Sequence, residues 1–136
     1  LAGSGIRVLD GDFTLNHVTL ADNSSAPAYN YDGTGTNQAF NSIAWGNIAG
    51  GFTGTFTSTS CNIDQNENAG TSIDPLFVNP GIGEDYHLQD LSPAVDACST
   101  GLPIALEGVP RPSSTRYDIG AFEIPFTDIF LPLIVK

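Results

Sequence analysis

Short alternations of apolar with small or polar residues recur along the first half of the chain. One such segment spans residues 15–23, and a similar segment spans residues 40–47. Their apolar positions align at an offset of 25 residues: Leu15 with Phe40, Val18 with Ile43, and Leu20 with Trp45. Alternation with a period of two is typical of a half-buried β-strand. The pattern therefore predicts a short strand in each segment.

Two weaker copies extend this repeat in both directions. Residues 58–64 place Ile63 where Ile43 stands in the copy before, and residues 6–12 match less closely. A unit of about 20–25 residues cannot bury its own apolar face, so it must stack on a neighbour. We therefore expect an all-β chain in which residues 1–64 form two to three coils of a parallel β-helix. An antiparallel sandwich with coincidental spacing is the alternative.

The composition of the chain changes after residue 64. Residues 64–71 are polar and turn-like, and prolines then recur between short apolar runs up to residue 124. A proline fixes its own φ, removes a backbone donor and holds the preceding residue extended. Because the last coil of a parallel stack exposes unpaired backbone groups, we predict that residues 65–124 form a Pro-rich cap of short strands and turns packed on the last coil.

Six short motifs follow one another in a characteristic order. They are Asn-Ser-Ile-Ala-Trp-Gly-Asn (41–47), Asp-Pro-Leu-Phe (74–77), Asp-Tyr-His-Leu (85–88), Ser-Pro-Ala-Val-Asp-Ala (92–97), Arg-Pro (111–112) and Asp-Ile-Gly-Ala-Phe-Glu (118–123). Together, over about residues 14–124, they resemble the choice-of-anchor type domain at the C-termini of secreted bacterial right-handed parallel β-helix proteins. The resemblance implies right-handed coils, a cell-surface setting, further coils upstream in a parent chain, and any catalytic groove on those upstream coils.

Residues 125–136 form a short apolar tail that ends in Lys136. The resemblance implies a surface-sorting tail at this place. The residues alone equally fit a final edge strand that packs on the cap. The tail is shorter than the roughly 20 residues that a membrane-spanning helix needs.

The charge of the chain excludes several classes of partner. Its 136 residues include 4 Lys+Arg and 15 Asp+Glu, which gives a formal net charge of −11. Nucleic acids and anionic membrane surfaces both need a basic footprint on the protein, so we expect neither as a partner, and no membrane span. The chain opens on Leu1 and lacks methionine, and we interpret it as a processed piece of a longer protein. Its first coil would then expose an open parallel edge, which predicts edge-to-edge homodimers through residues 6–20.

The two cysteines, Cys61 and Cys98, admit two interpretations. Their number and spacing fit neither a metal site nor a disulfide scaffold. A secreted protein, which the low lysine and high threonine and asparagine content favours, would bond them. The alternative is a pair of buried thiols that never meet. The resembled family often has glycine where Cys98 stands, which favours a local bridge from the cap to the last coil.

Sugar binding or polysaccharide cleavage of the pectate-lyase type is the alternative function. Tyr29 and Tyr31 lie in a Gly/Asn-rich stretch that we expect to face solvent, and Trp45, a third aromatic candidate, aligns with inward-facing Leu20. A hydrolase needs two carboxylates that flank the scissile bond, and a lyase needs Ca²⁺-binding carboxylates and a base. Residues 1–64 contain no adjacent acid pair and one cation, Arg7. We therefore predict that this chain is not an enzyme.

Four acids of the cap are candidate Ca²⁺ ligands: Asp74, Asp96, Asp118 and Glu123. Ca²⁺ takes six to eight oxygen ligands, but this spacing matches no EF-hand loop. Acids beside proline or glycine commonly accept backbone N–H groups at turns, so we expect structural acids and no cofactor, with Ca²⁺ as the alternative. His17 is expected to face outward and His87 to be hydrogen-bonded in the cap.

The sequence as a whole thus predicts a non-catalytic structural module of a secreted or cell-surface protein. It would seal one end of a β-helix, with upstream coils of the parent chain as its partner. Under the alternative function, a cell-wall or environmental polysaccharide would be the partner.

Overall fold

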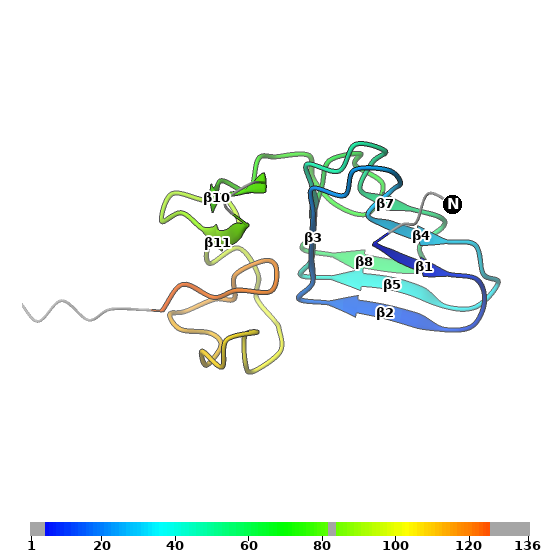
Figure 1. Cartoon of the computed structure of the whole chain (residues 1–136). Coiled ribbons are helices and arrows are strands. Elements are labelled where there is room, and N and C mark those ends of the chain that lie inside the picture. Colours follow the sequence, from blue (N-terminus) through cyan, green and yellow to red (C-terminus); the bar gives the residue numbers. More distant parts are fainter. Residues whose placement is uncertain (1–4, 82–83, 126–136) are drawn as a thin grey trace, which may run out of the picture.

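The computed structural model describes residues 5–81 and 84–125 (Figure 1). Short strands alternate with turns along this part of the chain, because β-branched and aromatic runs are repeatedly interrupted by Gly, Asn, Asp and Pro. The first nine strands are β1 (Ile6–Val8), β2 (Phe13–Asn16), β3 (Thr19–Ala21), β4 (Tyr29–Tyr31), β5 (Asn37–Phe40), β6 (Ile43–Trp45), β7 (Phe52–Thr53), β8 (Ser58–Ser60) and β9 (Ile63–Asp64). The predicted all-β class is confirmed.

These nine strands form three parallel sheets of three strands each. The first sheet has the order β1-β4-β7, the second β2-β5-β8, and the third β3-β6-β9. Each strand therefore pairs with the strand three places later in the chain, so three successive units lie on one another: residues 6–28, 29–51 and 52–71. Figure 1 shows β2, β5 and β8 side by side along one face of this stack. Parallel pairing confirms the predicted stacking and excludes the antiparallel sandwich for these strands.

The register between the first two units differs by one residue from the predicted offset. Thr19 pairs with Ile43 and Ala21 with Trp45, at an offset of 24 residues rather than 25. Ile63 pairs with Ile43, as predicted. A one-residue slip moves every side chain of a strand to the opposite face. The alignment of Trp45 with Leu20 was therefore wrong, and Trp45 faces away from the interior of the stack.

The same turn recurs at the corner before the third sheet in every unit. His17, Asn41 and Cys61 occupy equivalent positions and have φ of 53°, 51° and 56°. This left-handed conformation is costly for residues other than Gly, Asn and Asp. Its recurrence in three different residue types shows that the neighbouring strands impose the corner. The corner also sets the register, because it determines where each strand of the third sheet begins.

Aromatic and small side chains fill the interior of the stack. Tyr29 and Phe52 are fully buried, and their ring centroids lie 6.1 Å apart in an edge-to-face arrangement. Leu15, Ala39 and Ala44 complete the centre of this interior core. Such aromatic contacts add to the free energy gained by burying apolar surface.

The loop after β9 closes the interior at the end of the third unit. Asp64, fully buried, accepts hydrogen bonds from the backbone N–H groups of Phe52, Asn66, Asn68 and Ala69 at 2.9–3.2 Å. Ala69 is 5% exposed and packs into the interior core. Buried polar groups must be hydrogen-bonded, and one carboxylate satisfies four donors here.

The C-terminal segment, residues 72–125, contains an antiparallel pair, β10 (Phe77–Asn79) with β11 (Asp85–Leu88), and mostly irregular chain. It lies on the β3 side of the stack (Figure 1). A second hydrophobic core joins it to the outward face of the third sheet and contains Ile43, Ile63, Phe77, Leu88, Ala94, Cys98 and Ile119. This face is apolar because Ile43 and Ile63 point away from the interior core.

Hydrogen bonds connect the C-terminal segment to all three units. Gly120 N–H donates to the Asn41 carbonyl, and Ala121 N–H donates to Thr19 Oγ1. The segment therefore extends beyond the last coil, on which we predicted it to pack, and lies along the side of the stack. The apolar tail, residues 126–136, lies outside the described residues. Within residues 5–81 and 84–125, no helix is long and apolar enough to cross a membrane.

Candidate functional site

The structure buries two of the three aromatic residues that the sequence proposed for sugar binding. Tyr29 is fully buried and Tyr31 is 6% exposed, both in β4. The Tyr29 hydroxyl donates to Asn37 Oδ1 at 2.6 Å, and the Tyr31 hydroxyl donates to the Gly11 carbonyl at 2.8 Å. Burial raises the pKa of Tyr29 to about 12. The expectation that both tyrosines face solvent was wrong, because they are inward-facing strand residues of the second unit.

Trp45, the third aromatic candidate, is half-buried and lines a cleft of about 280 Å³. This cleft, called the Trp45 cleft below, lies between the corners of the first two units and the C-terminal segment. Its other lining residues are Asp22, Gly46, Asp74, Leu76, Phe77, Pro80 and Gln89. Trp45 and the Ca²⁺ candidate Asp74 thus share one cleft, although they belong to different parts of the chain.

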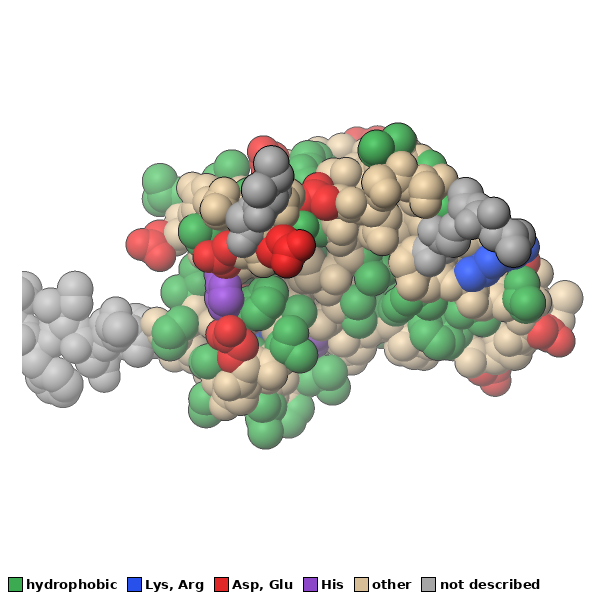
Figure 2. Space-filling view, in the orientation of Figure 1, with side chains coloured by type: hydrophobic (Ala, Val, Ile, Leu, Met, Phe, Trp, Pro, Cys, Tyr) green, Lys and Arg blue, Asp and Glu red, His purple; other side chains and the backbone are tan. Residues whose placement is uncertain are grey.

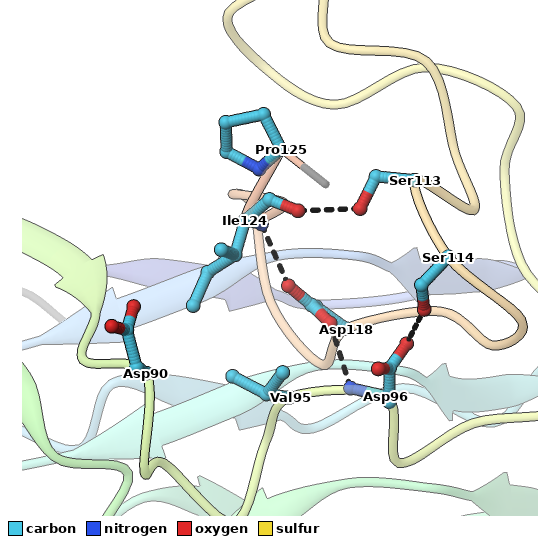
Figure 3. A pocket seen from close by; sticks show the side chains of 8 residues that line it. All are labelled: Asp90, Val95, Asp96, Ser113, Ser114, Asp118, Ile124 and Pro125. Carbon is cyan, nitrogen blue, oxygen red and sulfur yellow. Dashed lines mark hydrogen bonds between the residues drawn. The ribbon is translucent and has the colours of Figure 1, made fainter. Parts of the chain in front are cut away.

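Two of the remaining acids, Asp96 and Asp118, meet in another part of the C-terminal segment (Figure 3). Asp118 Oδ1 accepts the Asp96 N–H at 2.7 Å, and its Oδ2 accepts the Ile124 N–H at 2.8 Å. Burial raises the pKa of Asp118, and the two backbone N–H groups oppose this effect. Asp96 in turn accepts the Ser114 hydroxyl. These contacts tie three loops together around a cleft of about 300 Å³.

Glu123 extends this network by two hydrogen bonds. Its Oε1 accepts the Ser113 N–H at 2.9 Å and its Oε2 accepts the Asp118 N–H at 3.1 Å. Asp74 Oδ1 likewise accepts the Leu76 N–H at 2.9 Å. Within the described part of the chain, no three His, Cys, Asp or Glu side chains converge in a way that could hold a metal ion. The observed role of these acids is to hold turns of the C-terminal segment.

A buried cluster of Arg111, His17 and Glu123 lies where the C-terminal segment meets the first unit. Arg111 is 6% exposed, donates from Nη2 to the Gly120 carbonyl at 2.9 Å, and places Nε 3.6 Å from Glu123 Oε2. His17 is 8% exposed and its Nδ1 lies 3.3 Å from the same carbonyl. Burial and the charge of Arg111 lower the pKa of His17 to about 4. The expectation that His17 faces outward was wrong, because the C-terminal segment covers it.

Three nitrogen atoms of this cluster have no hydrogen-bond partner among the described residues: His17 Nε2, Arg111 Nε and Arg111 Nη1. Unsatisfied buried polar groups are rare and cost free energy. Burial also lowers the pKa of Arg111, while Glu123 and Asp118 raise it. The cluster is therefore the least satisfied part of the contact between the C-terminal segment and the stack.

His87 belongs to an exposed ionic group. Its Nδ1 lies 2.7 Å from Asp85 Oδ1 and its Nε2 lies 3.0 Å from Glu107 Oε2. The hydrogen bonds to Glu107 and Asp85 raise the pKa of His87. With an acid on each ring nitrogen, the imidazole joins the β11 strand to the loop at Glu107.

Cys61 and Cys98 form a disulfide in the structure, with Cα atoms 5.9 Å apart. Cys61 lies at the corner of the third unit and Cys98 lies in the C-terminal segment. The bond therefore crosses the same boundary as the contacts of Gly120 and Ala121. The disulfide thus links the C-terminal segment to the third unit, and the hydrogen bonds of Gly120 and Ala121 link it to the first two units.

Charge is unevenly distributed over the face shown in Figure 2. Acidic side chains gather over the C-terminal segment, at the left, whereas lysine and arginine colour appears mainly near the N-terminal unit. Arg7 of that unit pairs with Asp32 at 2.7 Å, and both side chains are exposed. An exposed pair of this kind contributes little stability.

Comparisons with protein-family models, with curated proteins and with solved structures found no match to this chain. Sequence reasoning missed the Arg111–His17 cluster and the role of Asp64. The role of Asp64 could have been predicted, because this acid ends the last repeated strand and is followed by the turn-forming residues Gln-Asn-Glu-Asn. No local signal links His17 to Gly120, because 103 residues separate them.

Proposed function

We propose that the chain is a non-catalytic structural module that ends a right-handed parallel β-helix in a secreted or cell-surface protein. In this proposal the coils grow upstream of β1, residues 65–71 close the opposite end, and the rest of the Pro-rich cap, up to residue 124, covers the third sheet along the side of the stack. The hand follows from the general preference of parallel strand crossovers for right-handed connections. The resemblance to choice-of-anchor domains leads to the same assignment.

The observation that carries the proposal is the asymmetry between the two ends of the stack. At the third unit, Thr71 N–H donates to the Asn62 carbonyl, Asp64 N–H donates to the Thr71 carbonyl, and Asn68 Nδ2 donates to the Phe52 carbonyl. The edges of β7 and β9 are thereby covered, whereas β8, whose three residues are exposed, ends the second sheet. At the first unit, β1, β2 and β3 are the terminal strands of their sheets. An edge of this kind accepts another parallel strand.

The side chains of the first unit also fit an addition upstream. Ile6, Val8, Phe13, Val18 and Leu20 are partly buried and pack on the interior core. A further coil would bury what remains exposed of them, and a second copy of this chain would do so by edge-to-edge pairing. The disulfide supports a secreted protein, because such bonds persist in oxidising compartments.

Adding one unit at two different places tests this proposal. Tyr29 pairs with Ile6 on one side and with Phe52 on the other, so a copy of residues 29–51 joins in register directly before Ile6 or directly before Phe52. The upstream copy extends the stack and leaves every contact of the C-terminal segment intact. The internal copy places a second Asn41 beside Cys61 but moves His17 and Thr19 of the first unit one layer further from Cys61, about 4.8 Å. It therefore breaks either the contacts of the first unit with Gly120 and Ala121 or the disulfide.

Urea unfolding of both variants gives the result. We expect the upstream variant to unfold cooperatively at an unchanged or higher urea midpoint and with a larger m-value, because more surface is exposed on unfolding. The internal variant, which has the same composition, should unfold at a lower midpoint. An upstream variant that is less stable than the internal one, or whose added unit remains unfolded, would refute the proposal.

A further inference from the structure

The Trp45 cleft combines aromatic walls with two carboxylates. Trp45 comes from the end of β6, and Phe77 from the start of β10. The Phe77 ring packs edge-to-face on Tyr86 at a centroid distance of 5.4 Å, and the Tyr86 hydroxyl donates to Asp22 Oδ2 at 3.0 Å. One aromatic side chain thus orients one of the two acids that line the cleft.

Both carboxylates keep an oxygen available. Asp22 uses Oδ2 for Tyr86, and Asp74 uses Oδ1 for the Leu76 N–H. Asp22 Oδ1 and Asp74 Oδ2 accept no hydrogen bond from the described residues. Gly46, at φ of 71°, leaves the room that the Asp22 carboxylate occupies, since an added Cβ would lie 2.2 Å from Asp22 Oδ1. The corner glycine therefore allows this acid to lie beside Trp45.

The charge at this place favours a cation. Two carboxylates line the cleft, no Lys or Arg does, and the chain carries a net charge of −11. A cleft with low-dielectric walls and charges of one sign concentrates ions of the opposite sign. An inorganic cation would need six or more oxygens, or nitrogen and sulfur ligands. An organic ammonium group instead gains from the face of an indole ring together with nearby carboxylates.

We propose that the Trp45 cleft binds an organic ammonium cation, with the charged group between Asp22 and Asp74 and against Trp45. Gln89 also lines the cleft, and its Nε2 donates to the Phe77 carbonyl at 2.9 Å. The volume of about 280 Å³ lies near the lower limit of small-molecule sites, which begin at roughly 300 Å³. The ligand is thus a small amine or the ammonium end of a longer molecule.

The single tryptophan of the chain makes the test specific to this cleft. Choline chloride, a quaternary ammonium salt, is titrated into the protein while the fluorescence of Trp45 is recorded, and potassium chloride at equal ionic strength is the reference. We expect a saturable change with choline that potassium does not reproduce. Glucose is the neutral probe, and we expect no saturable change with it.

Three single Asp→Asn variants test which carboxylates bind the ammonium group. Asp22→Asn and Asp74→Asn keep the hydrogen-bond acceptors for Tyr86 and Leu76 but remove a charge from the cleft. Asp90→Asn removes the same charge from the exposed acid that lines the cleft of Figure 3. We expect about two- to fivefold weaker choline binding for the first two variants and parental binding for the third.

Several outcomes would overturn the proposal. Superimposable choline and potassium titrations would show that bulk charge alone acts on Trp45. Equal weakening by all three amide variants would lead to the same conclusion. A saturable response to glucose without one to choline would assign the cleft to a neutral ligand. Because the substitutions are made at exposed acids, the folded state of each variant can be verified by its urea midpoint before the titration.

Discussion

Acid should weaken this protein through one buried imidazole. His17 is covered by the C-terminal segment, shares the Gly120 carbonyl with Arg111, and packs near the Tyr117 ring at a centroid distance of 6.2 Å. Burial and the neighbouring guanidinium lower its pKa to about 4 from 6.5. A proton added to His17 would thus place a second positive charge in a poorly satisfied contact.

The sign and size of the effect follow from linkage. Because the folded-state pKa lies below the unfolded one, the unfolded chain binds the proton first as the pH falls. The contribution of neutral His17 is fully present above the unfolded pKa of about 6.5 and is lost progressively down to about pH 4. The 2.5-unit difference corresponds to about 3 kcal/mol in total, and to about 2 kcal/mol at pH 5.

Urea unfolding at about pH 7.5 and pH 5, followed by Trp45 fluorescence, measures this loss. His17→Asn is the matched variant, since asparagine tolerates the φ of 53° and stands at the equivalent corner as Asn41. The raised pKa values of Asp118 and His87 act in the opposite direction, because each favours the folded state as the pH falls through its folded-state value. The difference between wild type and variant removes both contributions.

We expect wild type to lose about 2 kcal/mol more than His17→Asn between these two pH values. Equal losses in both proteins would refute the reasoning, and so would a wild type that gains stability relative to the variant. An NMR titration of the His17 ring is an independent check of its pKa. The ring signal should shift near pH 4 rather than near pH 6.5.

Three further predictions concern the disulfide, the buried Asp64 carboxylate and the buried ion pair between Arg111 and Glu123. Reduction of the Cys61–Cys98 bond, which joins residues 37 positions apart, should lower the free energy of unfolding by about 4 kcal/mol in the loop-entropy model. A variant with both cysteines replaced by alanine should not respond to reductant. If reductant changes the stability of wild type and variant equally, the bond is contradicted. Asp64→Asn turns an amide N–H₂ toward backbone donors and should cost about 3 kcal/mol in urea unfolding, whereas a loss below 1 kcal/mol would show that the loop does not depend on the carboxylate. Arg111→Met alone should lower the free energy of unfolding by about 3–5 kcal/mol because Glu123 is left buried and charged. Adding Glu123→Gln should recover part of this stability in a double-mutant cycle. Strictly additive losses in the two single variants and the double variant would exclude the ion pair.

The stacking of strands was predictable from the residues because it depends on local alternation. Ile43 and Ile63 share one pattern and pair in the structure. The exact register was not predictable, since the corner residues His17, Asn41 and Cys61 have different side chains and share only a backbone conformation. The alternation in Tyr29-Asn30-Tyr31 was a usable strand signal that the surrounding glycines and asparagines obscured.

The candidate sites depended far more on contacts between distant residues. Trp45 and Asp74 line the same cleft only because the C-terminal segment lies along the third sheet. His17 meets Gly120 for the same reason, across 103 residues. No local sequence pattern around either partner predicts these contacts.

The amino-acid sequence by itself therefore determined the all-β class, the parallel stacking of units and the acidic charge balance, from which we expect neither nucleic acids nor anionic membranes as partners. These properties follow from the period of the apolar positions and from the balance of charges, which are local or additive. Tertiary structure decided which face of the third sheet is covered, which acids remain exposed, and which imidazole and guanidinium are buried together. Burial is a property of the surface that a side chain meets, and for Ile43, Trp45 and His17 the C-terminal segment, which begins at residue 72, supplies much of that surface.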